Sequence, residues 1–259
     1  MPRALATLIA LTALLVVAAP ADAARRETRP NVLVLMTDDQ TLESMRVMPR
    51  VKALLGDEGT TFDRSFVSFS LCCPSRATLF TGQYAHNHRV LGNTPPLGGY
   101  RKLDKTNWLP LWLQRAGYRT VHLGKFLNGY GADNPFEVPP GWSEWYGSVD
   151  PSTYRFSGYT LNENGVLHGY GEYSTDLYSR RASELIARLA PSRRPFFLSV
   201  GFLAPHAGGP PDPDDPRNQG TPSPAPRHRD VFAADPLPRP PPSTSSTCPT
   251  SRPRSSGGS

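Results

Sequence analysis

The chain has 259 residues, 38% of them hydrophobic, which suits one packed domain of ordinary size. Its net charge of +6 is modest and lacks a clustered basic run or aromatic platform, so we expect no nucleic-acid partner, although an acidic substrate is compatible. Its three cysteines are an odd set without regular spacing, which argues against a disulfide framework and for a packed core.

The first 23 residues have the pattern of a secretory signal peptide. Arg3 gives the positive start, residues 4–19 are apolar, and residues 21–23 form a small-x-small cleavage site. The alternative is a membrane anchor, but the apolar run is short for a bilayer span. We therefore expect cleavage, a secreted extracellular protein, and no stable membrane anchor afterwards.

Residues 31–37 form a continuous apolar run, which predicts a strand buried on both faces, as in an α/β sheet. Asp38 and Asp39 follow at once. Adjacent carboxylates repel each other, and a divalent cation would relieve that repulsion. A site made of oxygen ligands favours calcium or magnesium over zinc. The alternative is a solvated turn after the strand.

A short helix is predicted at residues 48–55, and a second helix is predicted to begin near Cys72 and to stop at Gly82. Cys72 would then lie just before a helix N-terminus, where free N–H groups and the helix dipole favour an anion. Arg76, one turn on, could point back and neutralise that charge. The alternative is that Cys72 and Cys73 are a buried or disulfide-bonded structural pair.

Helical and apolar segments alternate in the second half of the chain. We expect helices at residues 109–116 and 174–189 and buried strands at residues 118–123 and 195–201. This alternation predicts an α/β layered domain over residues 24–206. Lys125 and His206 follow the strands predicted at residues 118–123 and 195–201. They would lie beyond the carboxyl ends of these strands, where ligands collect in such sheets. Taken alone, each could be an ordinary surface or loop residue.

The motif at residues 72–76, Cys-Cys-Pro-Ser-Arg, resembles the Cys-x-Pro-Ser-Arg signature of the sulfatase family. The chain has further family-like motifs: Arg29-Pro30-Asn31-Val32, Asp38-Asp39-Gln40, Gly124-Lys125 and Ala204-Pro205-His206. Others are similar to the N-acetylglucosamine-6-sulfatase branch: His86-Asn87-His88, residues 124–131 and Pro140-Gly141-Trp142. The resemblance covers about residues 29–206. It implies the N-terminal portion of an alkaline-phosphatase-like layered α/β sheet flanked by helices.

The resemblance also implies a chemistry. A formylglycine-generating enzyme would oxidise Cys72 to formylglycine, and a hydroxyl of the hydrated aldehyde would attack the sulfur of a sulfated carbohydrate substrate. The products would be the alcohol and, after elimination, sulfate. Asp38, Asp39 and the modified Cys72 would bind Ca²⁺, with Mg²⁺ possible.

Other residues take roles by position in the family motifs. Arg76 would stabilise the hydrate, Lys125 would hold the sulfate oxygens, and His206 would contact the sulfate or transfer a proton. Leu127 stands where many sulfatases have a histidine, a change that the N-acetylglucosamine-6-sulfatase branch shares. Candidates for binding the sugar are His86, His88 and Asn128; the alternative for His86 and His88 is a place in an exposed loop.

The composition changes after His206. Residues 207–259 are rich in proline and serine and lack an apolar period, which predicts a disordered tail. The second pair of metal ligands in sulfatases, in an Asp-Asn-Gly context, does not follow His206, so we expect a truncated domain. One back-translation of residues 243–252, shifted by one base, reads as an ordinary globular sequence. This predicts a frameshift from about residue 240; the alternative is a genuine low-complexity tail.

Three functions therefore stand side by side. The first is a sulfatase acting on sulfated sugars of the N-acetylglucosamine 6-sulfate kind. The second is an inactive truncated fragment that lacks half of the metal site. The third is a hydrolase of phosphate or phosphonate esters, because related enzymes use the same modified cysteine.

Overall fold

The computed structural model describes residues 29–209 and 220–236. The predicted signal peptide and the predicted frameshift from about residue 240 lie outside these ranges, as does much of the predicted tail. The chain divides into two compact units, Met1–Ser223 and Pro224–Ser259. In the second unit the described residues include a 3₁₀ helix, η5 (Pro226–His228). Across the described ranges, no helix combines the length and apolar character needed to cross a bilayer.

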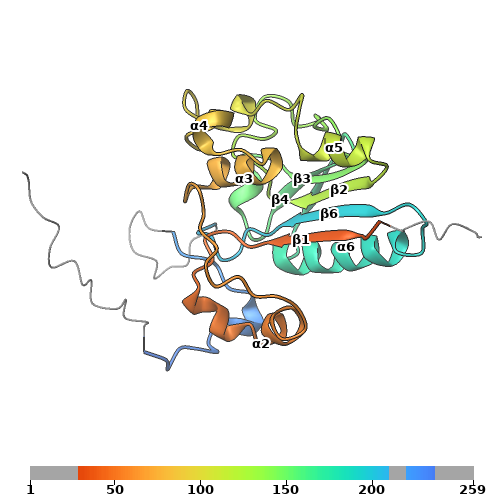
Figure 1. Cartoon of the computed structure of the whole chain (residues 1–259). Coiled ribbons are helices and arrows are strands. Elements are labelled where there is room, and N and C mark those ends of the chain that lie inside the picture. Colours follow the sequence, from red (N-terminus) through yellow and green to blue (C-terminus); the bar gives the residue numbers. More distant parts are fainter. Residues whose placement is uncertain (1–28, 210–219, 237–259) are drawn as a thin grey trace, which may run out of the picture. The chain divides into compact units, whose positions relative to one another are not determined.

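A six-stranded sheet organises the first unit (Figure 1). Its strand order is β1-β6-β2-β3-β4-β5; the first four of these strands run parallel, and β4 and β5 continue the sheet antiparallel. The strands are β1 (Val32–Met36), β2 (Arg119–Gly124), β3 (Glu144–Ser148), β4 (Tyr159–Glu163), β5 (Val166–Tyr170) and β6 (Phe196–Gly201). The three strands predicted from apolar runs are thereby confirmed as β1, β2 and β6.

Helices cover both faces of the sheet (Figure 1). Neighbouring residues of a strand point to opposite faces; in β6, Phe197 therefore joins the cluster under α3 and α5, whereas Leu198 packs with α6. The helices are η1 (Glu43–Val47), α2 (Pro49–Val51), η2 (Lys52–Gly56), α3 (Cys72–Thr81), α4 (Ala85–His88), η3 (Tyr100–Lys102), α5 (Leu109–Arg115), η4 (Ser152–Tyr154) and α6 (Ser174–Leu189). The expected layered α/β fold is confirmed.

One prediction about β1 is wrong, because this strand is not buried on both faces. Leu33 and Leu35 are 42% and 51% exposed. Among the described strands, β1 pairs with β6 alone, so it lies at an edge. Leu33 is in register with Leu198, on the face that α6 covers, and α6 packs against β2 and β6. An apolar run in a sequence does not distinguish an edge strand from a central one.

The sequence analysis missed β3, β4 and β5, which contain polar and aromatic residues instead of apolar runs. A signal for part of this region was nevertheless present. Asn164 and Gly165, between β4 and β5, both have positive φ angles, of 52° and 93°. Asn-Gly favours the two-residue hairpin turn in which both central residues take this conformation, so the dipeptide indicates the β4–β5 hairpin.

Glu144 ties β2, β3 and α6 together. Its carboxylate accepts hydrogen bonds from Arg119 Nε at 2.6 Å, Arg188 Nη2 at 2.5 Å and the Tyr146 hydroxyl at 2.9 Å. Burial opposes ionisation of Glu144, but the hydrogen bonds from Arg188, Tyr146 and Arg119 together hold its pKa below the ordinary value of 4.5. The ionised carboxylate therefore stabilises the fold.

Glu144→Gln is expected to lower the free energy of unfolding by about 1–3 kcal/mol at pH 7, because it removes charged hydrogen bonds from a buried group. The folded pKa of Glu144 is depressed below 4.5, so its contribution is present above pH 4.5 and is lost as the pH falls through the folded value. The difference in the free energy of unfolding between wild type and variant should therefore become smaller in acid. Urea unfolding at pH 7 and at lower pH measures this difference. The exposed Glu184→Gln is the control; an equal loss there would contradict the assignment.

Candidate active site

The predicted catalytic residues meet at the carboxyl-terminal ends of the parallel strands. The parallel strands β1, β2 and β6 all end there. Asp38 follows β1, Lys125 follows β2, and His206 follows β6 after a short segment that ends in Ala204-Pro205. The N-terminus of α3 brings Cys72 to the same place. The Cys72 S–H donates to Asp38 Oδ1 at 3.6 Å, and Lys125 Nζ lies 3.9 Å from Cys72 Sγ.

Asp38 is a buried carboxylate between two buried cations. Its Oδ2 forms an ion pair with Lys125 and accepts from Arg76 Nη2 at 3.3 Å. Arg76 also donates from Nη1 to the Lys125 carbonyl at 2.6 Å, so α3 is fixed to the end of β2. Burial disfavours the charge on Asp38, but Arg76 and Lys125 bring its pKa below the ordinary value. The three charged groups leave one positive charge in excess.

Cys72 is the first residue of α3, one position inside the helix, whereas the sequence placed it just before the helix N-terminus. Burial raises the pKa of its thiol; the charge of Lys125 offsets part of this effect, and Asp38 and Asp39 add to it. A thiol with a raised pKa is mostly protonated near neutral pH and is a weak nucleophile. This environment does not favour a cysteine that reacts as a free thiolate.

The donors that would hold a divalent cation are partly assembled. Asp38, Cys72 and His206 offer ligand atoms that lie within 4.8 Å of one another. Asp39 is exposed, has a φ of 59°, and places Oδ2 at 3.5 Å from His206 Nε2. The carboxylates suit a hard cation, but Ca²⁺ takes six to eight oxygen ligands. These residues therefore fit one side of a calcium site and do not complete it.

The three residues predicted to bind the sugar lie in different surroundings. The ring of His86 stacks on Tyr84, with centroids 5.8 Å apart. His88 is buried; its Nδ1 accepts from the Val90 amide and its Nε2 lies 3.1 Å from Thr78 Oγ1, so both nitrogens are engaged inside the protein.

Asn128, the third of these residues, lies beside Cys73. Its amide N–H donates to Cys73 Sγ at 3.1 Å, and its Oδ1 accepts from the Cys73 S–H at 3.3 Å. Its Nδ2 donates to the hydroxyl of Tyr154. A direct contact of any of the three residues with a sugar stays a prediction.

Tyr154, at the end of η4, is the residue that the sequence analysis missed. Its ring centroid lies 4.5 Å from Lys125 Nζ and 5.1 Å from the centroid of the His206 ring. No motif surrounds position 154. Its place in the site follows from the course of the chain between β3 and β4, which the sequence pattern did not reveal.

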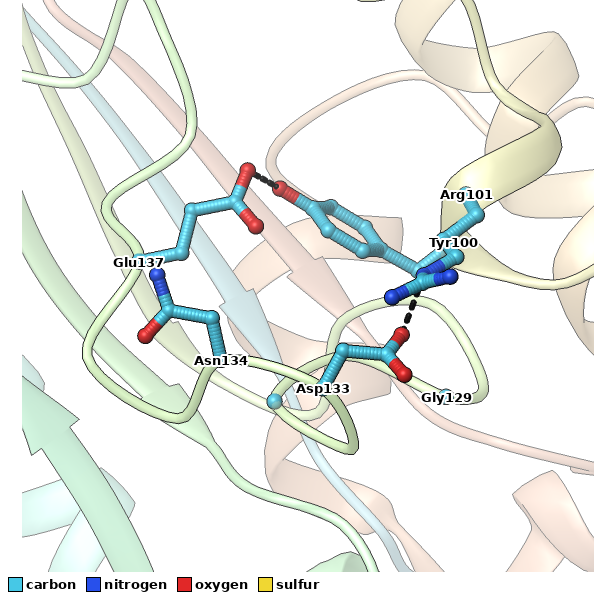
Figure 2. Close-up of a pocket in the computed structure, with 7 residues that line it drawn as sticks. Tyr100, Arg101, Gly129, Asp133, Asn134 and Glu137 are labelled. Atoms are coloured by element: carbon cyan, nitrogen blue, oxygen red, sulfur yellow. Dashed lines mark hydrogen bonds and ion pairs between the residues drawn. The ribbon is translucent and has the colours of Figure 1, made fainter.

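A small pocket of about 120 Å³ lies between η3 and the loop that follows β2 (Figure 2). The Tyr100 hydroxyl donates to Glu137 and Arg101 pairs with Asp133, as the dashed lines in Figure 2 show. Gly129 also lines this pocket, and it follows Asn128 in the chain. None of the predicted catalytic residues lines it.

Comparison with known families gives a clear result. The family model described as Sulfatase matches residues 30–233. Human N-acetylglucosamine-6-sulfatase is 39% identical over 196 residues, which cover 69% of this chain and 35% of that protein. The extracellular sulfatase SULF-1 homolog of Drosophila melanogaster is 39% identical over 197 residues, which cover 72% of this chain and 17% of that protein.

A solved structure agrees in fold. The structure of BT4656 in complex with its substrate, D-glucosamine-2-N,6-O-disulfate, has a TM-score of 0.63 and 26% sequence identity. The match covers 82% of this chain and 39% of that one. The chain thus spans about a third or less of the length of the human and Drosophila relatives.

Iodoacetamide is expected to label Cys72 before Cys73 in the unmodified folded chain. Burial raises the pKa of Cys73 to about 11, and Cys73 is 0% exposed against 9% for Cys72. Fragmentation of the peptide that carries both cysteines gives the order of labelling. In urea the two rates should converge, which controls for intrinsic reactivity. Faster labelling of Cys73 in the folded chain would show that the burial is wrong.

Proposed function

The chain belongs to the sulfatase family, and on that premise we propose that its protein hydrolyses sulfate esters of sulfated sugars, with formylglycine at position 72 as nucleophile. One observation carries the proposal: Cys72, at the start of α3, lies against a buried cluster of Asp38, Arg76 and Lys125 that has one positive charge in excess.

This excess charge suits a sulfate ester. A buried uncompensated cation is costly, and a bound monoanion would balance it. The raised pKa of the Cys72 thiol adds a second argument, because a protonated thiol is a poor nucleophile, whereas an aldehyde hydrate at the same position does not depend on a thiolate.

The residues around position 72 have separate tasks. Hydrated formylglycine would supply the hydroxyl that attacks sulfur, the bond between sulfur and the sugar oxygen would break, and reformation of the aldehyde would then release sulfate. Arg76 holds the hydrate in place, and Lys125 offsets the negative charge that grows on the sulfate oxygens. His206 donates a proton to the departing sugar oxygen. Asp38, Asp39 and residue 72 would hold Ca²⁺, which polarises the sulfate.

We place the substrate among sugars related to N-acetylglucosamine 6-sulfate. The human relative carries that sugar ester in its name, and the substrate in the BT4656 complex is a sulfated glucosamine. The N-terminal pattern supports export, and the Drosophila relative is named as extracellular. A formylglycine-generating enzyme is the partner that this chemistry requires.

An inactive fragment is the competing interpretation, and the incomplete donor set for calcium favours it. Among the described residues, Asp38 lies with Cys72 and His206, and Asp39 adds one further carboxylate, where a calcium site takes six to eight oxygens. Release of sulfate by this chain decides between the two. A hydrolase of phosphonate esters is the third candidate, and it predicts preferential turnover of a phosphonate over a sulfate monoester.

Cys72→Ala is expected to abolish sulfate release from N-acetylglucosamine 6-sulfate after coexpression with a formylglycine-generating enzyme. Folding should be kept, because the lost sulfur is small; the cost is about 1 kcal/mol. Ion chromatography of sulfate and thermal unfolding measure the two effects. The wild-type chain produced without the converting enzyme is the matched control and should be inactive. Residual turnover by the variant would rule out the nucleophile assignment.

Removal of divalent cations is expected to reduce sulfate release at least tenfold, because Asp38 and Asp39 then lose the ion that polarises the sulfate. The assay follows the converted chain after dialysis against a chelator and again after addition of Ca²⁺ or Mg²⁺. Full activity in the chelator would contradict a metal at these carboxylates.

A further inference from the structure

We propose that Tyr154 is a positioning residue that holds the Lys125 ammonium beside residue 72. The inference rests on the proposed function for its significance, but the contact itself can be tested without turnover. Tyr154 reaches three members of the site at once: Lys125, His206 and, through its hydroxyl, Asn128.

The backbone that carries Tyr154 is firmly held. In η4, Ser152 Oγ donates to the Val149 carbonyl at 2.7 Å and accepts from the Thr160 amide at 2.9 Å. The Tyr154 carbonyl accepts from the Gly209 amide at 2.8 Å. The ring therefore projects from a short helix that is anchored to β4 and to the segment after His206.

The Tyr154 ring faces the ammonium of Lys125, a flexible side chain. Lys125 carries its charge on a flexible four-carbon stem, and an ammonium within about 6 Å of an aromatic centroid is attracted to the ring face. Here that distance is 4.5 Å, and the same ammonium lies 3.9 Å from Cys72 Sγ. Tyr154 thus restricts the Lys125 ammonium in addition to its ion pair with Asp38.

The hydroxyl sets the position of the ring relative to α3. Tyr154 accepts from Asn128 Nδ2, and Asn128 is bonded through its own N–H and Oδ1 to Cys73, the neighbour of residue 72. Burial, together with the nearby Cys72, Asp150 and Asp38, raises the pKa of Tyr154, so the phenol stays neutral. A chain of contacts therefore connects the first turn of α3 to the ammonium.

A role in packing alone is the alternative. Under that alternative, replacing the ring would disturb the site to the same extent whether or not an ammonium stands over it. If Tyr154 positions Lys125, replacing the ring should change the reactivity of Cys72 only while the Lys125 ammonium is present. A double-mutant cycle separates the two.

The experiment measures the rate of Cys72 alkylation by iodoacetamide at pH 8 in the unmodified full chain. The variants are Tyr154→Met, Tyr154→Phe, Lys125→Met and the two Tyr154 changes combined with Lys125→Met. Methionine fills much of the space without a π face, and phenylalanine keeps the face while losing the hydroxyl. Thermal unfolding of each variant checks folding, and Tyr154→Leu replaces Tyr154→Met if the latter does not fold.

Tyr154→Met is expected to slow alkylation by about 2- to 30-fold, the range of a cation–π contact, because the ammonium no longer stabilises the thiolate. Tyr154→Phe keeps the ring face but loses the hydroxyl that positions it, so its alkylation rate should fall between those of wild type and Tyr154→Met. Tyr154→Met should have no effect when Lys125 is already methionine. Equal effects of Tyr154→Met with and without Lys125 would overturn the proposal. The proposed function fails in a separate assay, if the wild-type chain with formylglycine at position 72 releases no sulfate.

Discussion

The arrangement of the site depends on one buried carboxylate. Asp38 lies two residues after the end of β1, and its ion pairs with Arg76 and Lys125 join α3 to the end of β2. Two cations around one anion are costly to bury unless a further negative charge arrives. The cluster beside Cys72 therefore carries one positive charge in excess, which a bound anion would balance. Under the proposed function Asp38 would also hold the metal ion, so the binding of sulfate and of the cation would be coupled through this carboxylate.

Much of this could be predicted from the sequence, because the decisive patterns are local. Apolar runs predict β1, β2 and β6, the spacing of apolar residues predicts α6, and the motif around Cys72 predicts both the family and the nucleophile. Asp38, Lys125 and His206 follow strands directly, and parallel strands bring such residues to one edge. The strands β3, β4 and β5 and the place of Tyr154 beside the site could not be predicted from the sequence. They depend on which segments become neighbours after the chain turns back, and short aromatic and polar strands leave little period to detect.

The family match and the geometry bear on different parts of the chemistry. The match covers residues 30–233 and a minor share of the relatives' length. Within that span lie the nucleophile position, both buried cations, His206 and the aromatic ring beside them. Among the described residues, the carboxylates beside Cys72 offer fewer oxygens than a calcium ion takes. The described part of this span thus brings together the groups that, under the proposed function, would recognise a sulfate and attack it, and that would hold one side of a cation.

The edge position of β1 has a consequence for the behaviour of the chain in solution. A strand with one unpaired side offers a row of backbone donors and acceptors on which another strand can be added, and proteins usually blunt such edges with charge, proline or a covering element. Here the edge strand also turns Leu33 and Leu35 outward. Among the described strands, hydrogen bonding and apolar burial therefore both favour the addition of a further strand along β1. Such a strand would lie beside the segment that leads into Asp38.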